Sequence, residues 1–149
     1  MRVLTKAYGE VDVDERQRIV FPFGILGFDQ LKRYVLLDAR QQPFYWLQCM
    51  DVVEVAFVLI NPRIFRPEYE LEVDTQELRE IDIQSPDDIL DFAIVTIPEN
   101  PAKMTANLRG PIIINKRTRV GRQSISLNPK WEVRHAIMEE LAAVEHKPC

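Results

Sequence analysis

Residues 104–115 read Met104-Thr105-Ala106-Asn107-Leu108-Arg109-Gly110-Pro111-Ile112-Ile113-Ile114-Asn115 and combine two kinds of sequence. The first half is polar and ends in Gly110-Pro111, a pair that favours a turn because glycine tolerates unusual backbone angles and proline fixes φ. Three consecutive isoleucines follow, which is typical of a β-strand buried on both faces. We therefore predict a turn that leads into a central strand.

Short apolar segments recur along the rest of the chain, separated by turn residues at intervals of roughly 8–12 residues, the spacing of all-β folds. We expect strands in an N-terminal hairpin over 1–14 and over 34–37, 44–50, 52–60, 69–74, 92–97, 112–115 and 123–127. Helical signals are brief: Thr75 can cap a helix over 76–81, and Ser85-Pro86 resembles a second helix start. The pattern predicts a mainly β single domain, a small antiparallel β-barrel or sandwich with one or two short helices.

The chain has 149 residues, which is enough for one domain with one core. We place a β domain at residues 1–127 and a C-terminal tail, helical or disordered, at residues 128–149. Apolar residues and His135 recur at helical spacing between Trp131 and Leu141, which favours a terminal helix.

Composition narrows the class of protein. No apolar run approaches the roughly 18 residues of a membrane helix, and the N-terminus lacks a hydrophobic signal core, so we expect a soluble, cytoplasmic protein. Cys49 and Cys149 cannot build a disulfide framework, and with His135 and His146 they show no metal-binding spacing. We expect neither a metal nor a cofactor.

Charge is distributed unevenly along the chain. Residues 66–91 contain ten acidic and two basic residues, a net charge of −8, so the remainder carries +4 of the total of −4. Between residues 103 and 135, eight basic residues face a single acid, Glu132. The sequence therefore predicts a surface with an acidic and a basic side.

Residues 69–74 alternate strictly between apolar and acidic side chains. On a strand, side chains alternate between the two faces, so all the acids share one face. The acids on this face and the one that follows it are Glu68, Glu70, Glu72, Asp74 and Glu77. Such a row is either a solvated outer face or a negatively charged surface for a basic partner.

Residues 19–28 are apolar but contain one proline and two glycines, which disfavour a regular helix or a central strand. We predict a loop here. Ile25, Leu26 and Phe28 either fold over one end of the core or form an apolar anchor for a partner.

Catalytic motifs are absent from the sequence, which has neither a phosphate-binding glycine loop nor a recognisable nucleophile and base. We expect that the protein is not an enzyme. The aromatic run Phe44-Tyr45-Trp46 lacks interleaved Lys or Arg and favours core packing over base stacking. The basic turn 116–122 leaves a nucleic-acid-binding barrel open as an alternative, and a small-molecule-binding barrel would need an open interior.

Four blocks together resemble the FliW family of flagellar assembly factors. They are the segment 104–115 and the runs Phe21-Pro22-x-Gly24-x-x-Gly27-Phe28, Pro43-Phe44-Tyr45-Trp46-Leu47-Gln48 and Ala93-Ile94-Val95-Thr96-Ile97-Pro98. The resemblance covers most of residues 1–127, and no motif extends it past Asn128.

The resemblance implies a cytoplasmic bacterial protein with a small β-barrel fold and no catalytic activity. Family members bind flagellin and, as a competing partner, the RNA-binding translational regulator CsrA. When flagellin has been exported, free FliW captures CsrA and relieves its repression of flagellin translation. The acidic row suits a partner that meets RNA phosphates with basic surface. We expect a chain that is monomeric when free and binds neither nucleic acid nor a membrane directly.

Overall fold

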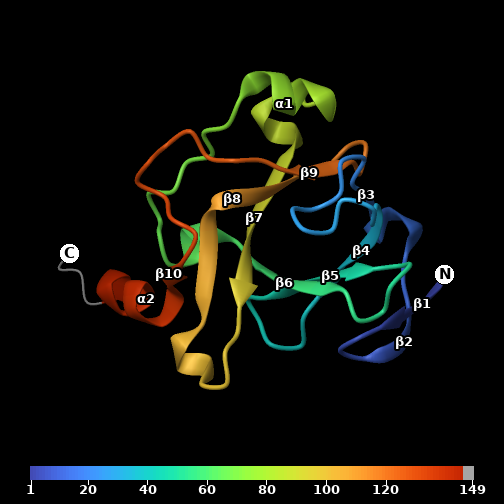
Figure 1. The fold of residues 1–149 in the computed structure, drawn as a ribbon, viewed down its shortest axis with the longest axis horizontal. Coiled ribbons are helices and arrows are strands. Elements are labelled where there is room, and N and C mark those ends of the chain that lie inside the picture. The colour runs from blue at the N-terminus through green and yellow to red at the C-terminus, as the bar shows by residue number, and fades with distance from the viewer. Residues whose placement is uncertain (146–149) are drawn as a thin grey trace.

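The computed structural model describes residues 1–145, and Figure 1 shows a strongly curved sheet with two short helices at its margins. The strands are β1 (Arg2–Thr5), β2 (Gly9–Asp12), β3 (Arg18–Val20), β4 (Arg33–Asp38), β5 (Tyr45–Cys49), β6 (Ala56–Ile60), β7 (Ile89–Thr96), β8 (Thr105–Asn115), β9 (Gly121–Gln123) and β10 (His135–Ala136). The helices are α1 (Thr75–Glu80) and α2 (Ile137–Glu145), with single 3-10 turns η1 (Glu15–Gln17), η2 (Pro62–Ile64), η3 (Pro86–Asp88) and η4 (Pro101–Lys103).

The main sheet is antiparallel, with the strand order β10-β8-β7-β6-β5-β4-β3 and with β9 also paired to β8. The first and last parts of this sheet meet at a bridge between Val20 and Val120, where the Val20 N–H donates to the Arg119 carbonyl at 3.1 Å. The sheet is therefore nearly closed, and the predicted mainly β, barrel-like fold is confirmed. The predicted N-terminal hairpin is present as β1 and β2.

Strand β8 is bent, because its pairing with β7 jumps from Phe92 opposite Ile112 to Ile94 opposite Asn107. Residues 108–111 form the resulting bulge. The prediction of a turn at Gly110-Pro111 is thus wrong, because the strand begins earlier, at Thr105, and continues through these two residues. A bulge and a turn use the same residue types, but here the flanking residues stay paired with β7.

The bulge is fixed by two side chains. The Asn107 Oδ1 accepts the backbone N–H groups of Arg109 at 3.0 Å and Gly110 at 2.9 Å, and the Gln123 Nε2 donates to the Gly110 carbonyl at 2.9 Å. A Cβ at position 110 would lie only 2.9 Å from the Gln123 Nε2. A side chain at position 110 would therefore have to displace the Gln123 amide that holds the bulge.

The three isoleucines after the bulge are fully buried, which confirms a strand covered on both faces. Ile112 and Ile114 belong to the cluster inside the barrel, together with Phe21 and Leu47. Ile113 points to the other face and packs in a cluster under α1. Of the aromatic run, Tyr45 contacts the barrel interior, as predicted for core packing.

Residues 69–74 do not form the predicted strand. Their burial alternates as expected, with Tyr69 and Val73 buried and the acids exposed, but no strand pairs with them. Alternating burial requires only an extended backbone, and a single backbone hydrogen bond, from the Leu127 N–H to the Glu72 carbonyl at 2.7 Å, ties this part of the chain to a distant segment.

Smaller differences concern the ends of elements. The cap of α1 is Asp74 rather than Thr75, because the Asp74 side chain accepts the Gln76 N–H. The strand predicted over 52–60 starts only at Ala56, since residues 52–55 close the hairpin with β5. The predicted cap of the second short helix, Ser85, is confirmed for η3.

Residues beyond 127 pack on the same sheet. Strand β10 pairs with the start of β8, and Trp131 is buried in a cluster with Leu108 and Ile137. The predicted terminal helix is present as α2 and starts at Ile137, after Trp131 and His135. Residues 146–149, with His146 and Cys149, lie outside the described residues. No helix within residues 1–145 is long and apolar enough to cross a membrane.

Replacing Asn107 tests the role of the bulge. Asn107→Ala removes the acceptor of two backbone N–H groups, so we expect the free energy of unfolding to fall by about 1–3 kcal/mol in urea titrations followed by circular dichroism. Asn107→Asp keeps both acceptor positions and should lose clearly less. Equal losses in the two variants would show that the side-chain oxygen does not hold the bulge.

Candidate functional site

The acidic segment, which we define as residues 68–77, runs along the outside of the sheet from η2 to α1, and Figure 1 shows it as the green chain that rises to the upper helix. Buried Tyr69 and Val73 hold it against the core. The four acids of the predicted row are all exposed, namely Glu68, Glu70, Glu72 and Asp74. The exposed row is therefore present although its backbone is not a strand.

The acids of this segment differ in their electrostatic environment. Glu68 lies 3.4 Å from Arg66 and 3.7 Å from Lys130, and its carboxyl pKa is lowered by a hydrogen bond to its own backbone and by these two cations. Asp74 caps α1, and Glu77 lies 3.5 Å from Arg122. Within the described part of the chain, Glu70 and Glu72 form no ion pair, so their charge is available to a partner.

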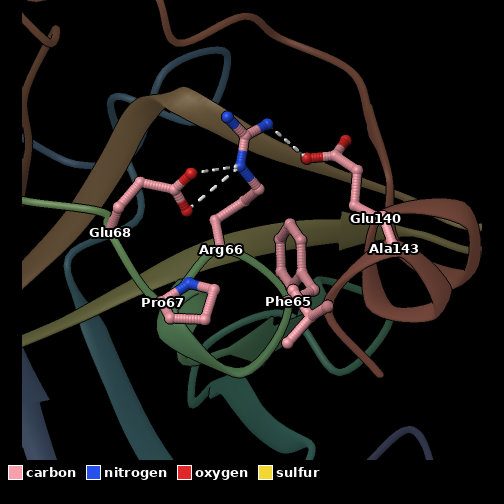
Figure 2. Close-up of a pocket in the computed structure, with 7 residues that line it drawn as sticks. Phe65, Arg66, Pro67, Glu68, Glu140 and Ala143 are labelled. Carbon is pink, nitrogen blue, oxygen red and sulfur yellow. Dashed lines mark hydrogen bonds and ion pairs between the residues drawn. The ribbon is translucent and has the colours of Figure 1, made fainter. Parts of the chain in front are cut away.

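Arg66 connects the acidic segment to α2, as Figure 2 shows. Its guanidinium lies between Glu68 and Glu140, donates to the Glu140 carboxylate at 2.7 Å, and stacks over the Trp131 ring at 4.9 Å. Beside it is an open hollow of ≈ 330 Å³, lined partly by Phe65 and by α2. The segment and the helix are therefore held together by one partly buried charge network.

His135 continues the same network. Its Nε2 accepts the backbone N–H of Glu132 at 2.9 Å, which places the ring proton on Nδ1, 3.1 Å from the Glu140 carboxylate. Both ring nitrogens are used and the side chain is buried. His135 is a structural link, and sequence reasoning, which placed it in a tail prone to disorder, missed this role.

The three residues predicted in the 19–28 loop have different environments. Ile25 is 1% exposed and belongs to the barrel core, whereas Leu26 is 75% exposed. Phe28 is 38% exposed and packs edge-on against Phe57, with 5.3 Å between ring centroids. Among the three, Leu26 presents the most side chain to a partner.

Exposed Phe23 and Ile125 lie beside Leu26 and line a shallow hollow of ≈ 160 Å³ with it. The sequence offered no signal for this apolar patch, because Phe23 and Ile125 are about 100 residues apart and meet only in the fold. Arg122 joins the patch to the acids: its guanidinium stacks over Phe23 at 4.9 Å and pairs with Glu77. Apolar and acidic surface are therefore neighbours.

The basic turn 116–122 is partly neutralised. Arg117 lies 3.1 Å from Asp82 and 3.8 Å from Asp88, and Arg122 lies 2.6 Å from Glu80. Arg117 lowers the pKa of the Asp82 carboxyl through a direct hydrogen bond. Two of the four cations of the turn are thus engaged with acids, which weakens the case for a phosphate-binding surface.

No group of three or more His, Cys, Asp or Glu side chains within residues 1–145 is arranged to hold a metal ion. The fold and the surface define a small, nearly closed antiparallel β-barrel protein with an acidic segment and an adjacent apolar patch.

Comparison with known proteins gives the family. The model of the FliW protein family matches residues 2–137. The flagellar assembly factor FliW of Treponema denticola is 43% identical over 96% of this chain and 97% of its own, and that of Leptospira interrogans serovar Lai is 44% identical over 97% of each. A crystal structure of the flagellar assembly factor FliW superposes with a TM-score of 0.85 at 33% identity, covering 92% of this chain and 96% of that one. This chain belongs to the FliW family.

Removing Arg66 tests the link between the acidic segment and α2. Arg66→Ala leaves Glu140 without its arginine partner and uncovers Trp131, so we expect the free energy of unfolding to fall by about 1.5–3 kcal/mol, measured by urea denaturation with tryptophan fluorescence. Arg79→Ala, at an exposed position of α1, is the matched control and should change stability by less than about 0.5 kcal/mol. A loss no larger than the control's would contradict the network.

Proposed function

We propose that this protein is a non-catalytic flagellar assembly factor of the cytoplasm that binds flagellin and, when free of flagellin, captures CsrA and relieves its repression of flagellin translation. Family membership supports the assembly role. The observation that carries the CsrA part is the pair Glu70 and Glu72, two exposed carboxylates without an ion pair among residues 1–145.

Electrostatics gives these acids a physical role. A protein that binds RNA phosphates presents basic surface, and a negative field attracts such a surface over a distance set by the ionic strength. Glu68, Asp74 and Glu77 extend the field on either side of the pair, although each also has a structural task. Because the acids also repel RNA phosphates, the same field would disfavour RNA on the resulting complex.

The 19–28 loop provides the apolar contacts of the proposed partner-binding surface. Central apolar contacts commonly supply most of the binding energy of a charged interface. Leu26 is the exposed anchor, Phe28 contributes its exposed edge, and Ile25 fixes the loop from inside the barrel. The loop is held in place by a hydrogen bond from the Leu26 N–H to the Gln123 Oε1 at 3.0 Å. A preordered loop loses little conformational entropy on binding.

A double charge reversal tests the electrostatic role. Glu70→Lys with Glu72→Lys should slow association with CsrA by roughly tenfold or more at low salt and flatten its salt dependence, as measured by stopped-flow fluorescence. Glu15→Lys with Glu99→Lys makes the same change in net charge at two exposed acids elsewhere. Equal association rates in the two double variants would rule out a local role for the acidic segment.

Leu26 tests the apolar anchor. Leu26→Ala removes an exposed side chain, so stability should change by less than about 0.5 kcal/mol while partner affinity falls by roughly tenfold or more in calorimetric titrations. Phe28→Ala is the comparison, because it also removes the contact with Phe57 and should lower the melting temperature. Unchanged affinity of folded Leu26→Ala for both flagellin and CsrA would eliminate this anchor.

The exchange of partners can be tested directly. Pull-down of the tagged protein from native lysate should recover CsrA when flagellin is scarce and flagellin when it is added in excess. Simultaneous recovery of both partners at saturating flagellin would contradict a competitive exchange.

A further inference from the structure

A third hollow lies where η1, β4, β5 and the turn between β8 and β9 meet. Its volume is ≈ 420 Å³, within the range of small-molecule sites. The residues that line it are Arg16, Gln17, Leu36, Asp38, Tyr45 and Arg119. None of them belongs to the acidic segment or to the apolar patch described above.

The backbone of Arg119 is in the left-handed region, with φ of 60°. Arg119 is the last residue of the turn, where its N–H donates to the Asn115 carbonyl at 2.9 Å and its carbonyl accepts the Val20 N–H at 3.1 Å. Such a position favours glycine or asparagine, because a Cβ is strained there. Glycine would form the same two hydrogen bonds, so the turn itself does not explain the arginine.

Within residues 1–145, the side chain of Arg119 forms no ion pair or hydrogen bond. Its Nε is buried without a hydrogen-bond partner in the part of the chain that the structure describes, and no carboxylate in that part forms an ion pair with it. A buried donor without a partner costs free energy. Strained backbone and an unsatisfied donor in one residue, at the wall of a hollow, are typical of a ligand-binding residue.

The other groups in the hollow define what it can bind. In the part of the chain that the structure describes, the Arg16 guanidinium forms one long hydrogen bond, 3.5 Å to the Lys116 carbonyl, and no ion pair. Gln17 is already occupied by the Leu36 carbonyl and the Asp14 N–H. The lining of the hollow therefore includes two arginines, one carboxylate residue, Asp38, and the aromatic Tyr45.

We propose that this hollow binds the phosphate group of a small phosphate ester, with Arg119 and Arg16 donating to the phosphate oxygens and Asp38 accepting from a hydroxyl group of the ligand. Arginine forms paired, charge-assisted hydrogen bonds with phosphate, and within residues 1–145 neither guanidinium has a carboxylate partner that would compete with the ligand. The requirement for a hydroxyl group follows from Asp38, which would repel an anion that offers it no donor. This site is separate from the partner-binding surface proposed above.

The test uses the full chain and titration calorimetry with ribose 5-phosphate, adenosine monophosphate, inorganic phosphate and ribose. We expect saturable binding of at least one of the two esters, weaker binding of inorganic phosphate, and none of ribose. A short oligoribonucleotide forms a further arm. Saturation by the oligoribonucleotide alone would overturn the proposal in favour of a nucleic-acid contact, and no saturation by any ester would overturn it outright.

Arg119→Gly is the decisive variant, because it removes the guanidinium and relieves the backbone strain. We expect ester affinity to fall by about tenfold or more while the melting temperature stays equal or rises. Arg16→Ala should also weaken binding, and Arg79→Ala, which makes the same charge change on α1, should not. Wild-type affinity in Arg119→Gly, or a lower melting temperature with full affinity, would show that Arg119 serves the fold.

Discussion

Strand β8 is paired on both edges at both of its ends, and this constraint sets the position of the rest of the sheet. One edge pairs with β7 on both sides of the bulge, while the other pairs with β10 near Thr105 and with β9 near Ile113. A straight strand could not serve both partners, so the bulge at 108–111 bends it. The hydrogen bonds of Asn107 and Gln123 fix that bend. The cluster inside the barrel takes Ile112 and Ile114 from after the bulge, and the cluster around Trp131 takes Ala106 from before it.

Local sequence predicted the parts of the fold that depend on local physics. Three isoleucines in a row specify burial on both faces wherever the strand lies, and Ser85 caps η3 without help from distant residues. The bulge could not be distinguished from a turn, because only pairing with β7 separates the two. For the same reason, the alternation in 69–74 predicted burial correctly but strand pairing wrongly. Pairing requires another strand with a free edge nearby, and the sequence of the segment itself does not show whether one is present.

In the candidate site, too, local sequence predicted some features and only the fold determined the others. Exposure of the acids followed from their alternation, but which of them form ion pairs depends partly on cations from distant parts of the chain. Arg66, Arg122 and Lys130 pair with Glu68 and Glu77, while Glu70 and Glu72 have no ion pair within residues 1–145. The loop 19–28 was predicted as a loop, yet only the fold separates buried Ile25 from exposed Leu26 and brings Ile125 beside it.

Closure of the barrel differs from the pairing elsewhere in the sheet. Strands β7 and β8 share seven residue pairs, whereas within residues 1–145 the ends of the sheet meet through one bridge, between Val20 and Val120. Closure of the curved sheet therefore depends on this one bridge. Opening this bridge breaks few hydrogen bonds, so solvent should enter the barrel interior first between β3 and the end of the β8–β9 turn. Amide hydrogen exchange at this place would then report local opening rather than global unfolding.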